Sequence, residues 1–313
     1  MPTVLDFHTH SYHSTDGGIT PQDLVAGAKA NNPAIAAMAL SDHNTYSGCQ
    51  DFLAACKAHG VEGFVSAEVS GAHPDRPDIE FHFLTMFGNA WTEDVSRRTA
   101  MFTPHFNALY KTDTENILLF LEAAGRLGHN IPLRSVVQKS VAFYHGLPDD
   151  RKNPAMIGPA TFHRVREVLD DLKLIDHERR GGKSEFEKDV WRKAGVKPAP
   201  TPNITDAYPI YGQARPAVIL AHPMHYGLSV EQLRPFIEEW IREIGLIGLE
   251  AHYAGVLHAQ WKALADELGL LVSAGSDRHN GYIAGDPTAG VPVVEDGQAD
   301  MNALLEALRR CAY

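Results

Sequence analysis

Val4-Leu5-Asp6-Phe7-His8-Thr9-His10, residues 4–10, opens the chain with a short apolar strand that ends in two histidines. In an extended segment, residues two apart point to the same face, so His8 and His10 project side by side. Neutral imidazole is a common metal ligand, and two converging imidazoles can chelate one ion. A strand whose polar residues merely alternate with apolar ones would give the same pattern. The metal interpretation therefore depends on further ligands elsewhere in the chain.

Apolar runs farther along the chain also end at histidine or acidic residues. They cover residues 34–40, 63–67, 217–221 and 270–275. The side chains that follow them are His43, Glu68, His222, Asp277 and His279. A further run, residues 80–84, carries His82 at its centre. The same kind of side chain thus recurs where predicted strands end.

Helical patterns separate most of these runs, for example at Cys49–His59 and Ser229–Ile244. Short apolar strands that alternate with helices indicate a parallel sheet or barrel. In such folds the carboxyl ends of the strands meet at one face, where active sites collect. We therefore expect an α/β domain in which the polar strand ends lie close together.

Composition excludes several functional classes. The net charge of -11 over 313 residues argues against a protein that binds duplex nucleic acid, because phosphate contacts need a basic face. Cys49, Cys56 and Cys311 have no paired spacing, which disfavours a disulfide framework and suits a reducing compartment. No cleavable signal or bilayer-spanning apolar run is recognisable, so we expect a cytoplasmic protein without a membrane partner.

The middle of the chain differs from the rest in composition and in predicted secondary structure. Residues 93–204 are rich in charge and helical in pattern, and they end in the boundary-like Pro198-Ala199-Pro200-Thr201-Pro202. Because ligand-bearing strands resume afterwards, we interpret this block as a helical insertion that caps the substrate. Residues 1–92 and 205–313 would then form one metal-binding barrel. A separate helical domain in simple series is the alternative.

Nine imidazole and carboxylate groups would meet at one end of one sheet. They are His8, His10, Asp16, His43, Glu68, His82, His222, Asp277 and His279. Burying such groups without partners would carry a severe desolvation cost, and metal coordination is the simplest compensation. The sequence therefore predicts a multinuclear metal site.

These motifs, in this order, resemble those of the PHP (polymerase and histidinol phosphatase) family of the amidohydrolase-like group. The matching elements are His8-x-His10, Asp42-His43, Glu68 after an apolar strand, His222-Pro223 and Ser276-Asp277-x-His279. The resemblance implies a distorted (β/α)7 barrel with a helical insertion domain. The insertion is similar to that of small-nucleotide and cyclic-phosphate phosphoesterases.

The resemblance also implies roughly two to three divalent ions, with manganese favoured and iron or zinc as alternatives. His8 and His10 would hold one ion, Asp16 and His43 a second, and His82 and His222 a third. Glu68 and Asp277 would be shared between ions, and His279 would complete the set. Ser14-Thr15-Asp16-Gly17 departs from the usual Ser-Asp-Gly, so His13 competes with Asp16.

A hydroxide held between two cations would be the nucleophile in such a site. Asp277 would serve the catalytic ions, and His225 or His252 is a candidate to assist the leaving group, although either can be structural. The predicted activity is hydrolysis of a small phosphate ester: a nucleotide phosphomonoester, a cyclic phosphodiester or a sugar phosphate. The alternatives are an amidohydrolase-type C–N hydrolase and a non-catalytic or nucleic-acid-processing PHP module.

Substrate residues are harder to assign. In related phosphoesterases the insertion presents an Arg/His pair to the phosphate, but Pro159 stands here where the arginine is expected. His163 and Arg164 lie nearby and can replace that pair, and His145 belongs to another loosely basic neighbourhood. All three can equally be solvated helix residues.

Overall fold

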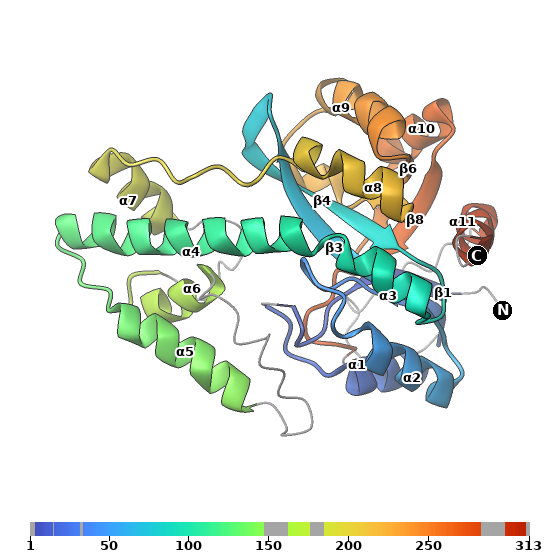
Figure 1. Cartoon of the computed structure of the whole chain (residues 1–313), viewed down its shortest axis with the longest axis horizontal. Coiled ribbons are helices and arrows are strands. Elements are labelled where there is room, and N and C mark those ends of the chain that lie inside the picture. Colours follow the sequence, from blue (N-terminus) through green and yellow to red (C-terminus); the bar gives the residue numbers. More distant parts are fainter. Residues whose placement is uncertain are drawn as a thin grey trace. The chain divides into compact units, whose positions relative to one another are not determined.

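The computed structural model describes residues 4–14, 16–31, 34–146, 162–175, 185–282 and 298–310. The chain divides into two compact units (Figure 1). One unit comprises Met1–Phe106 with Asn203–Tyr313, and the other comprises Asn107–Pro202.

The first unit is built on a mixed sheet of eight strands. The strands are β1 Val4–Thr9, β2 Ile35–Leu40, β3 Glu62–His73, β4 Arg76–Met86, β5 Ala217–Leu220, β6 Leu246–Tyr253, β7 Val256–Leu257 and β8 Leu271–Gly275. Neighbours pair in the order β1 to β7, and β8 pairs with β6. Backbone bonds from His10 N to Arg278 O (2.7 Å) and from Asp277 N to His8 O (2.8 Å) join β1 to the segment after β8. These bonds close the sheet, as the predicted barrel requires.

Helices cover the outside of this sheet. They are α1 Pro21–Ala30, α2 Cys49–His59, α3 Glu93–Ala100, α8 Tyr208–Ala214, α9 Val230–Glu243, α10 Ala259–Leu268 and α11 Gln298–Arg310. Two short 3-10 helices, Ile204–Ala207 and Pro223–His225, lie before α8 and after β5. Apolar side chains of α1 and α2 pack with those of β1 and β2 in one core, in which Leu24, Met38 and Phe52 are fully buried.

Three pairings differ from the expected parallel pattern. β3 and β4 form a long antiparallel hairpin, β4 is also antiparallel to β5, and β6 is antiparallel to β7. The prediction that the third strand ends at Glu68 is therefore wrong, because β3 continues to His73. Beyond Glu68, β3 gains hydrogen bonds from β4, and Val69 and Ala72 are fully buried. Glu68 consequently lies inside the sheet, where its side chain is completely shielded from water.

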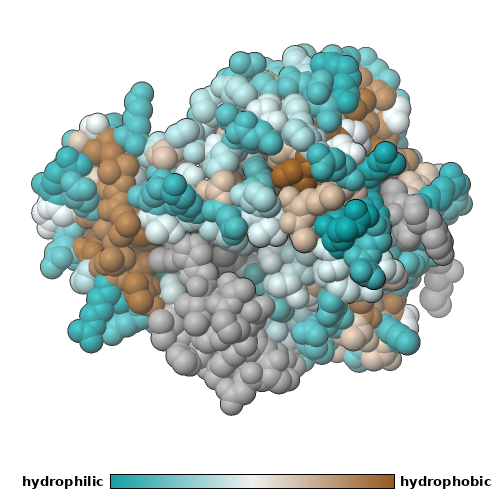
Figure 2. Space-filling model, in the orientation of Figure 1, coloured by the Kyte–Doolittle hydropathy of each residue, from teal (hydrophilic) through white to brown (hydrophobic). Residues whose placement is uncertain are grey.

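The second unit is helical over its described residues. It contains most of α4 Thr103–Arg126, together with α5 Leu133–Gly146, α6 Phe162–Asp171 and α7 Glu185–Ala194. Phe120 and Trp191 pack in its core with ring centroids 5.4 Å apart. Exposed apolar side chains on these helices include Leu118, Leu133 and Val137, and Figure 2 shows hydrophobic surface over this unit. That this unit caps a substrate stays a prediction.

Two further findings bear on the sequence predictions. Cys49 and Cys56 are buried free thiols, and burial raises the pKa of Cys56 to about 12. Within the described ranges, no helix combines the length and the apolar character needed to cross a bilayer. Cys311 lies outside the described residues.

Candidate metal centre

The buried carboxylate of Glu68 is the centre of the predicted site. Its two oxygens lie within 3.3 Å of ring nitrogens from five histidines. For Oε1 these are His82 Nδ1 at 2.8 Å and His222 Nε2 at 2.9 Å; for Oε2 they are His43 Nδ1 at 3.0 Å, His8 Nε2 at 3.2 Å and His10 Nε2 at 3.3 Å. A single carboxylate is thus surrounded by imidazoles from several strands.

The β1 strand presents His8 and His10 as the alternation predicts. Their ring centroids are 5.1 Å apart, and both side chains are fully buried. Asp277 approaches them from the segment after β8, with Oδ1 3.5 Å from His8 Nε2 and 3.1 Å from His10 Nε2. The hydrogen bond from Asp277 N to His8 O fixes this approach.

The cluster contains three overlapping groups whose ligand atoms lie within 4.8 Å of one another. They are His8, His10, Glu68 and Asp277; His10, Asp16, His43 and His279; and His43, Glu68 and His82. His222 reaches the third group through Oε1 of Glu68. All nine residues predicted as ligands are therefore brought together, although their grouping differs in part from the predicted pairs.

Asp16, rather than His13, faces this cluster. Asp16 Oδ2 lies 3.2 Å from His279 Nε2 and 3.4 Å from His43 Nε2. The ring of His13 instead lies 2.9 Å from the Ser47 hydroxyl. The turn that carries Asp16 depends on Gly17, because a Cβ there would lie 1.8 Å from the backbone oxygen of Ser11.

The charges in the cluster oppose the cost of burial. Burial alone would raise the pKa of Glu68, but the charges of His8, His82 and His43 hold that pKa well below its usual range. Burial lowers the pKa of His82, yet Glu68 and Glu80 outweigh it and raise this pKa to about 9. The attraction between Glu68 and the imidazoles around it thus offsets the cost of burying this carboxylate.

The donor set fits divalent ions. His8 Nε2, His10 Nε2 and Glu68 Oε2 are buried, and none of them forms a hydrogen bond with the part of the chain that the structure describes. Buried polar atoms normally have partners, so their convergence indicates a shared ligand of another kind. Mixed imidazole and carboxylate donors suit manganese, iron or zinc better than calcium.

Several residues that support the cluster were missed from the sequence. Glu250 in β6 contacts the ring of His8 and the backbone of His222. The Tyr253 hydroxyl donates to Asp277 Oδ2 at 2.8 Å. The Tyr226 hydroxyl donates to the backbone oxygen of Ala221 at 2.8 Å, just before His222. Glu250 could have been identified from the sequence, because it follows an apolar run just as Glu68 does.

The two predicted leaving-group residues differ in accessibility. His225 is exposed, and its ring centroid lies 4.7 Å from that of Tyr253. Partial burial and the nearby His222 lower the pKa of His225. His252 is buried in β6 and pairs with Leu257 of β7. Both catalytic roles stay predictions.

The predicted substrate residues belong to the second unit. Arg164 is buried in α6 and forms an ion pair with Glu167. His163 is also in α6 and His145 is in α5, but their side chains lie outside the described residues. Substrate binding by these three residues stays a prediction.

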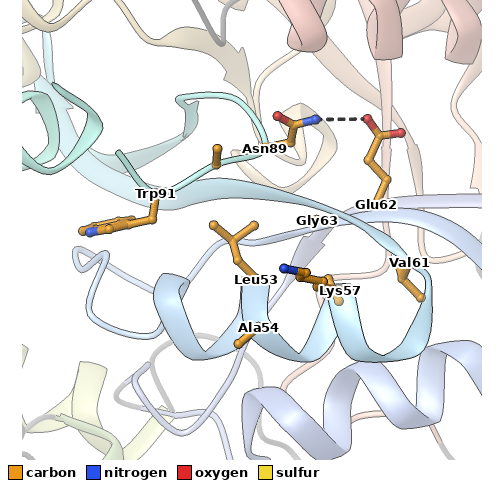
Figure 3. A pocket seen from close by; sticks show the side chains of 10 residues that line it. Leu53, Ala54, Lys57, Val61, Glu62, Gly63, Asn89 and Trp91 are labelled. Atoms are coloured by element: carbon orange, nitrogen blue, oxygen red, sulfur yellow. Dashed lines mark hydrogen bonds between the residues drawn. The ribbon is translucent and has the colours of Figure 1, made fainter. Parts of the chain in front are cut away.

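A pocket of about 440 Å³ lies elsewhere on the first unit, between α2 and the segment that follows β4 (Figure 3). Leu53, Val61 and Trp91 contribute apolar lining, and Asn89 donates to Glu62 at 3.4 Å. The lining contains no predicted ligand, so the metal centre is not this pocket.

Comparison with known proteins agrees with the fold and the cluster. Residues 6–145 match the family model of the PHP domain, a stretch that carries His8, His10, Asp16, His43, Glu68 and His82. Residues 6–145 thus carry a PHP domain, and the comparisons support a metal-dependent phosphoesterase, a hydrolase that acts on phosphoester bonds.

Individual relatives are distant. A protein of Haemophilus influenzae named 5'-3' exoribonuclease is 26% identical over 282 residues, which cover 89% of this chain and 91% of that protein. A solved structure from Bifidobacterium adolescentis, assigned to the metal-dependent phosphoesterases, is 22% identical with a TM-score of 0.60 and covers 91% of each chain. An amidohydrolase from Chromobacterium violaceum is 20% identical with a TM-score of 0.62 and covers 95% of this chain and 97% of that one. Likeness to these two structures shows the fold alone.

Proposed function

We propose that the chain hydrolyses a phosphate ester of a small nucleotide, either a phosphomonoester or a cyclic phosphodiester. The observation that carries the proposal is the buried Glu68 carboxylate within 3.3 Å of five imidazole nitrogens. Such a constellation favours several cations in one site. The scale of that positive charge suits an anionic phosphate better than a neutral amide.

Three sets of residues would hold the ions. They are His8, His10, Glu68 and Asp277; His10, Asp16, His43 and His279; and His43, Glu68, His82 and His222. Bound divalent ions would supply an activated water and neutralise charge on the phosphate oxygens.

Exposure of the predicted ligands gives the direction of substrate entry. The side chains of His8 and Glu68 are 0% exposed, whereas His43 is 19% and His279 is 26% exposed. The first two therefore form the floor of the site, and the other two line its open side. We propose that the phosphate enters over His43 and His279.

His225 is the predicted leaving-group residue that solvent reaches. Its ring centroid lies 4.7 Å from that of Tyr253, whose hydroxyl donates to Asp277. We therefore propose that His225 contacts the leaving group of the substrate. Burial makes His252 a weaker candidate for such a contact.

RNA is a second candidate substrate. The relative named 5'-3' exoribonuclease matches along 91% of its length, which favours a related substrate despite the low identity. The net charge of -11 opposes binding of a long duplex. A short single strand requires only that its terminal phosphoester reach the ions.

A substrate panel distinguishes these possibilities. The protein, stripped with chelator and reloaded with Mn²⁺, is incubated with nucleotides, cyclic nucleotides, sugar phosphates, 5'-phosphorylated RNA oligomers and amides. We expect phosphate release from a nucleotide or opening of a cyclic nucleotide, and no activity without metal. Stepwise loss of nucleotides from RNA would instead support the second candidate. Amide hydrolysis without cleavage of any phosphoester would overturn both.

A further inference from the structure

A second buried glutamate, Glu250, joins three strands behind the metal cluster. It lies in β6 with no exposed surface. Its Oε1 and Oε2 lie 3.1 and 3.2 Å from His8 Nδ1 in β1. The same Oε2 accepts the backbone N–H of His222, after β5, at 2.8 Å. One carboxylate therefore contacts two predicted ligands that belong to different groups.

The contact with His8 determines which ring nitrogen can bind a metal. An ionised carboxylate can only accept, so the proton of a neutral His8 ring lies on Nδ1. The lone pair is then on Nε2, the nitrogen that faces Glu68 and Asp277 at 3.2 and 3.5 Å. A histidine that binds a metal commonly donates its other N–H to a carboxylate in this way.

The contact with His222 restrains the backbone. His222 has a φ of 26°, a left-handed value that a non-glycine residue rarely adopts. The hydrogen bond to Glu250 helps to hold this conformation, which directs His222 Nε2 to within 2.9 Å of Glu68. Loss of the bond would allow the ring to leave the cluster.

The neighbouring β8 strand leaves room for this arrangement. A Cβ at Gly275 would lie 2.0 Å from Glu250 Oε1 and 2.3 Å from the Cβ of His8. No larger residue fits unless the glutamate or the histidine moves. The close packing at Gly275 is an observation independent of the hydrogen bonds, and it points to the same contact.

We propose that Glu250 is a positioning residue that orients His8 and His222 together for metal binding. The inference rests on the proposed metal-dependent function. Glutamine at this position is nearly isosteric but has only one accepting oxygen. If that oxygen stays on His222 N, it also stays 3.2 Å from His8 Nδ1, but the amide nitrogen then lies where Oε1 was, 3.1 Å from the same ring nitrogen, and two donors oppose each other. This opposition favours rotation of His8 or transfer of its proton to Nε2, the metal-facing atom.

The test is titration of the metal-free full chain with Mn²⁺ by isothermal calorimetry, which needs no substrate. We expect Glu250→Gln to weaken binding about 10- to 100-fold. Glu250→Asp keeps the charge but withdraws it by one methylene, so it should show a loss of similar size. Glu187→Gln is the control, because Glu187 is equally buried but bonds Arg166 at 3.1 Å in the second unit. Its affinity should equal that of the wild type.

The outcomes separate this inference from the proposed function. Wild-type affinity in both folded Glu250 variants would overturn the positioning role, whatever the substrate panel gives. An equal loss in Glu187→Gln would also overturn it, because the effect would then be general to buried glutamates. A wild-type protein that binds Mn²⁺ but cleaves no phosphoester would overturn the function and leave the role of Glu250 intact.

Discussion

Replacing Glu68 with glutamine should remove bound metal. Glu68 is fully buried, and each of its oxygens faces at least two imidazole nitrogens at 2.8–3.3 Å. Whichever way the amide of Glu68→Gln turns, its NH₂ group replaces an acceptor on one side of the cluster. Removing one partner from a buried charge pair costs about 3–5 kcal/mol, or between about 10² and 10⁴ in a binding constant.

The assay is metal content per chain by mass spectrometry after reloading with Mn²⁺ and gel filtration, followed by calorimetric titration. We expect Glu68→Gln to retain fewer ions than the wild type and to bind the remainder more weakly. Glu62→Gln is the matched control on the same strand, since its side chain pairs with Arg309 rather than with the cluster. A folded Glu68→Gln protein with the wild-type number of ions, bound within about threefold of wild-type affinity, would refute the central position of this carboxylate.

Three further predictions follow from single contacts. Tyr253→Phe removes the 2.8 Å hydrogen bond to Asp277 and should weaken Mn²⁺ binding about tenfold, measured by calorimetry; unchanged affinity would contradict a role for this bond. Burial lowers the pKa of His105, whose Nε2 donates to Ser70 O at 2.7 Å. The unfolded chain therefore takes up a proton below about pH 6.5 that the folded chain resists, so this part of the stability is present above that pH and is lost as pH falls. In urea, the free energy of unfolding of His105→Gln should be about 1 kcal/mol lower than that of the wild type at pH 8, and this difference should be smaller at pH 5.5. An equal difference at the two pH values would contradict the prediction. Phe120→Ala leaves a cavity in the core of the second unit and should destabilise that unit by about 3–5 kcal/mol in thermal unfolding, with metal content unchanged; loss of metal would contradict the assignment of all metal ligands to the first unit.

Much of the barrel and of its cluster could be predicted from local patterns. The alternation in β1 directs His8 and His10 to one side. The apolar runs before His43, His222 and Asp277 indicate buried strands and so place these three side chains just after the strand ends. Strand direction was harder to predict. An apolar run indicates that a strand is buried but does not specify its partner, so the antiparallel β3–β4 hairpin was not foreseen.

The supporting residues were missed for a related reason. Glu250 and Tyr253 lie on one strand, yet their partners are His8 and Asp277, more than twenty residues away in sequence in each case. A bulge between Glu250 and His252 also interrupts the simple alternation along β6. Contacts of this kind depend on the register between strands, which is set by the whole sheet rather than by any local pattern.

Crystals of the Mn²⁺-reloaded protein, with diffraction data collected at the manganese absorption edge, offer the most direct test of the metal centre. Anomalous peaks should lie among His8, His10, Glu68 and Asp277, with further peaks beside His43 and next to His82 and His222. A fully reloaded crystal without any peak among these side chains would contradict the assignment of this cluster as the metal centre.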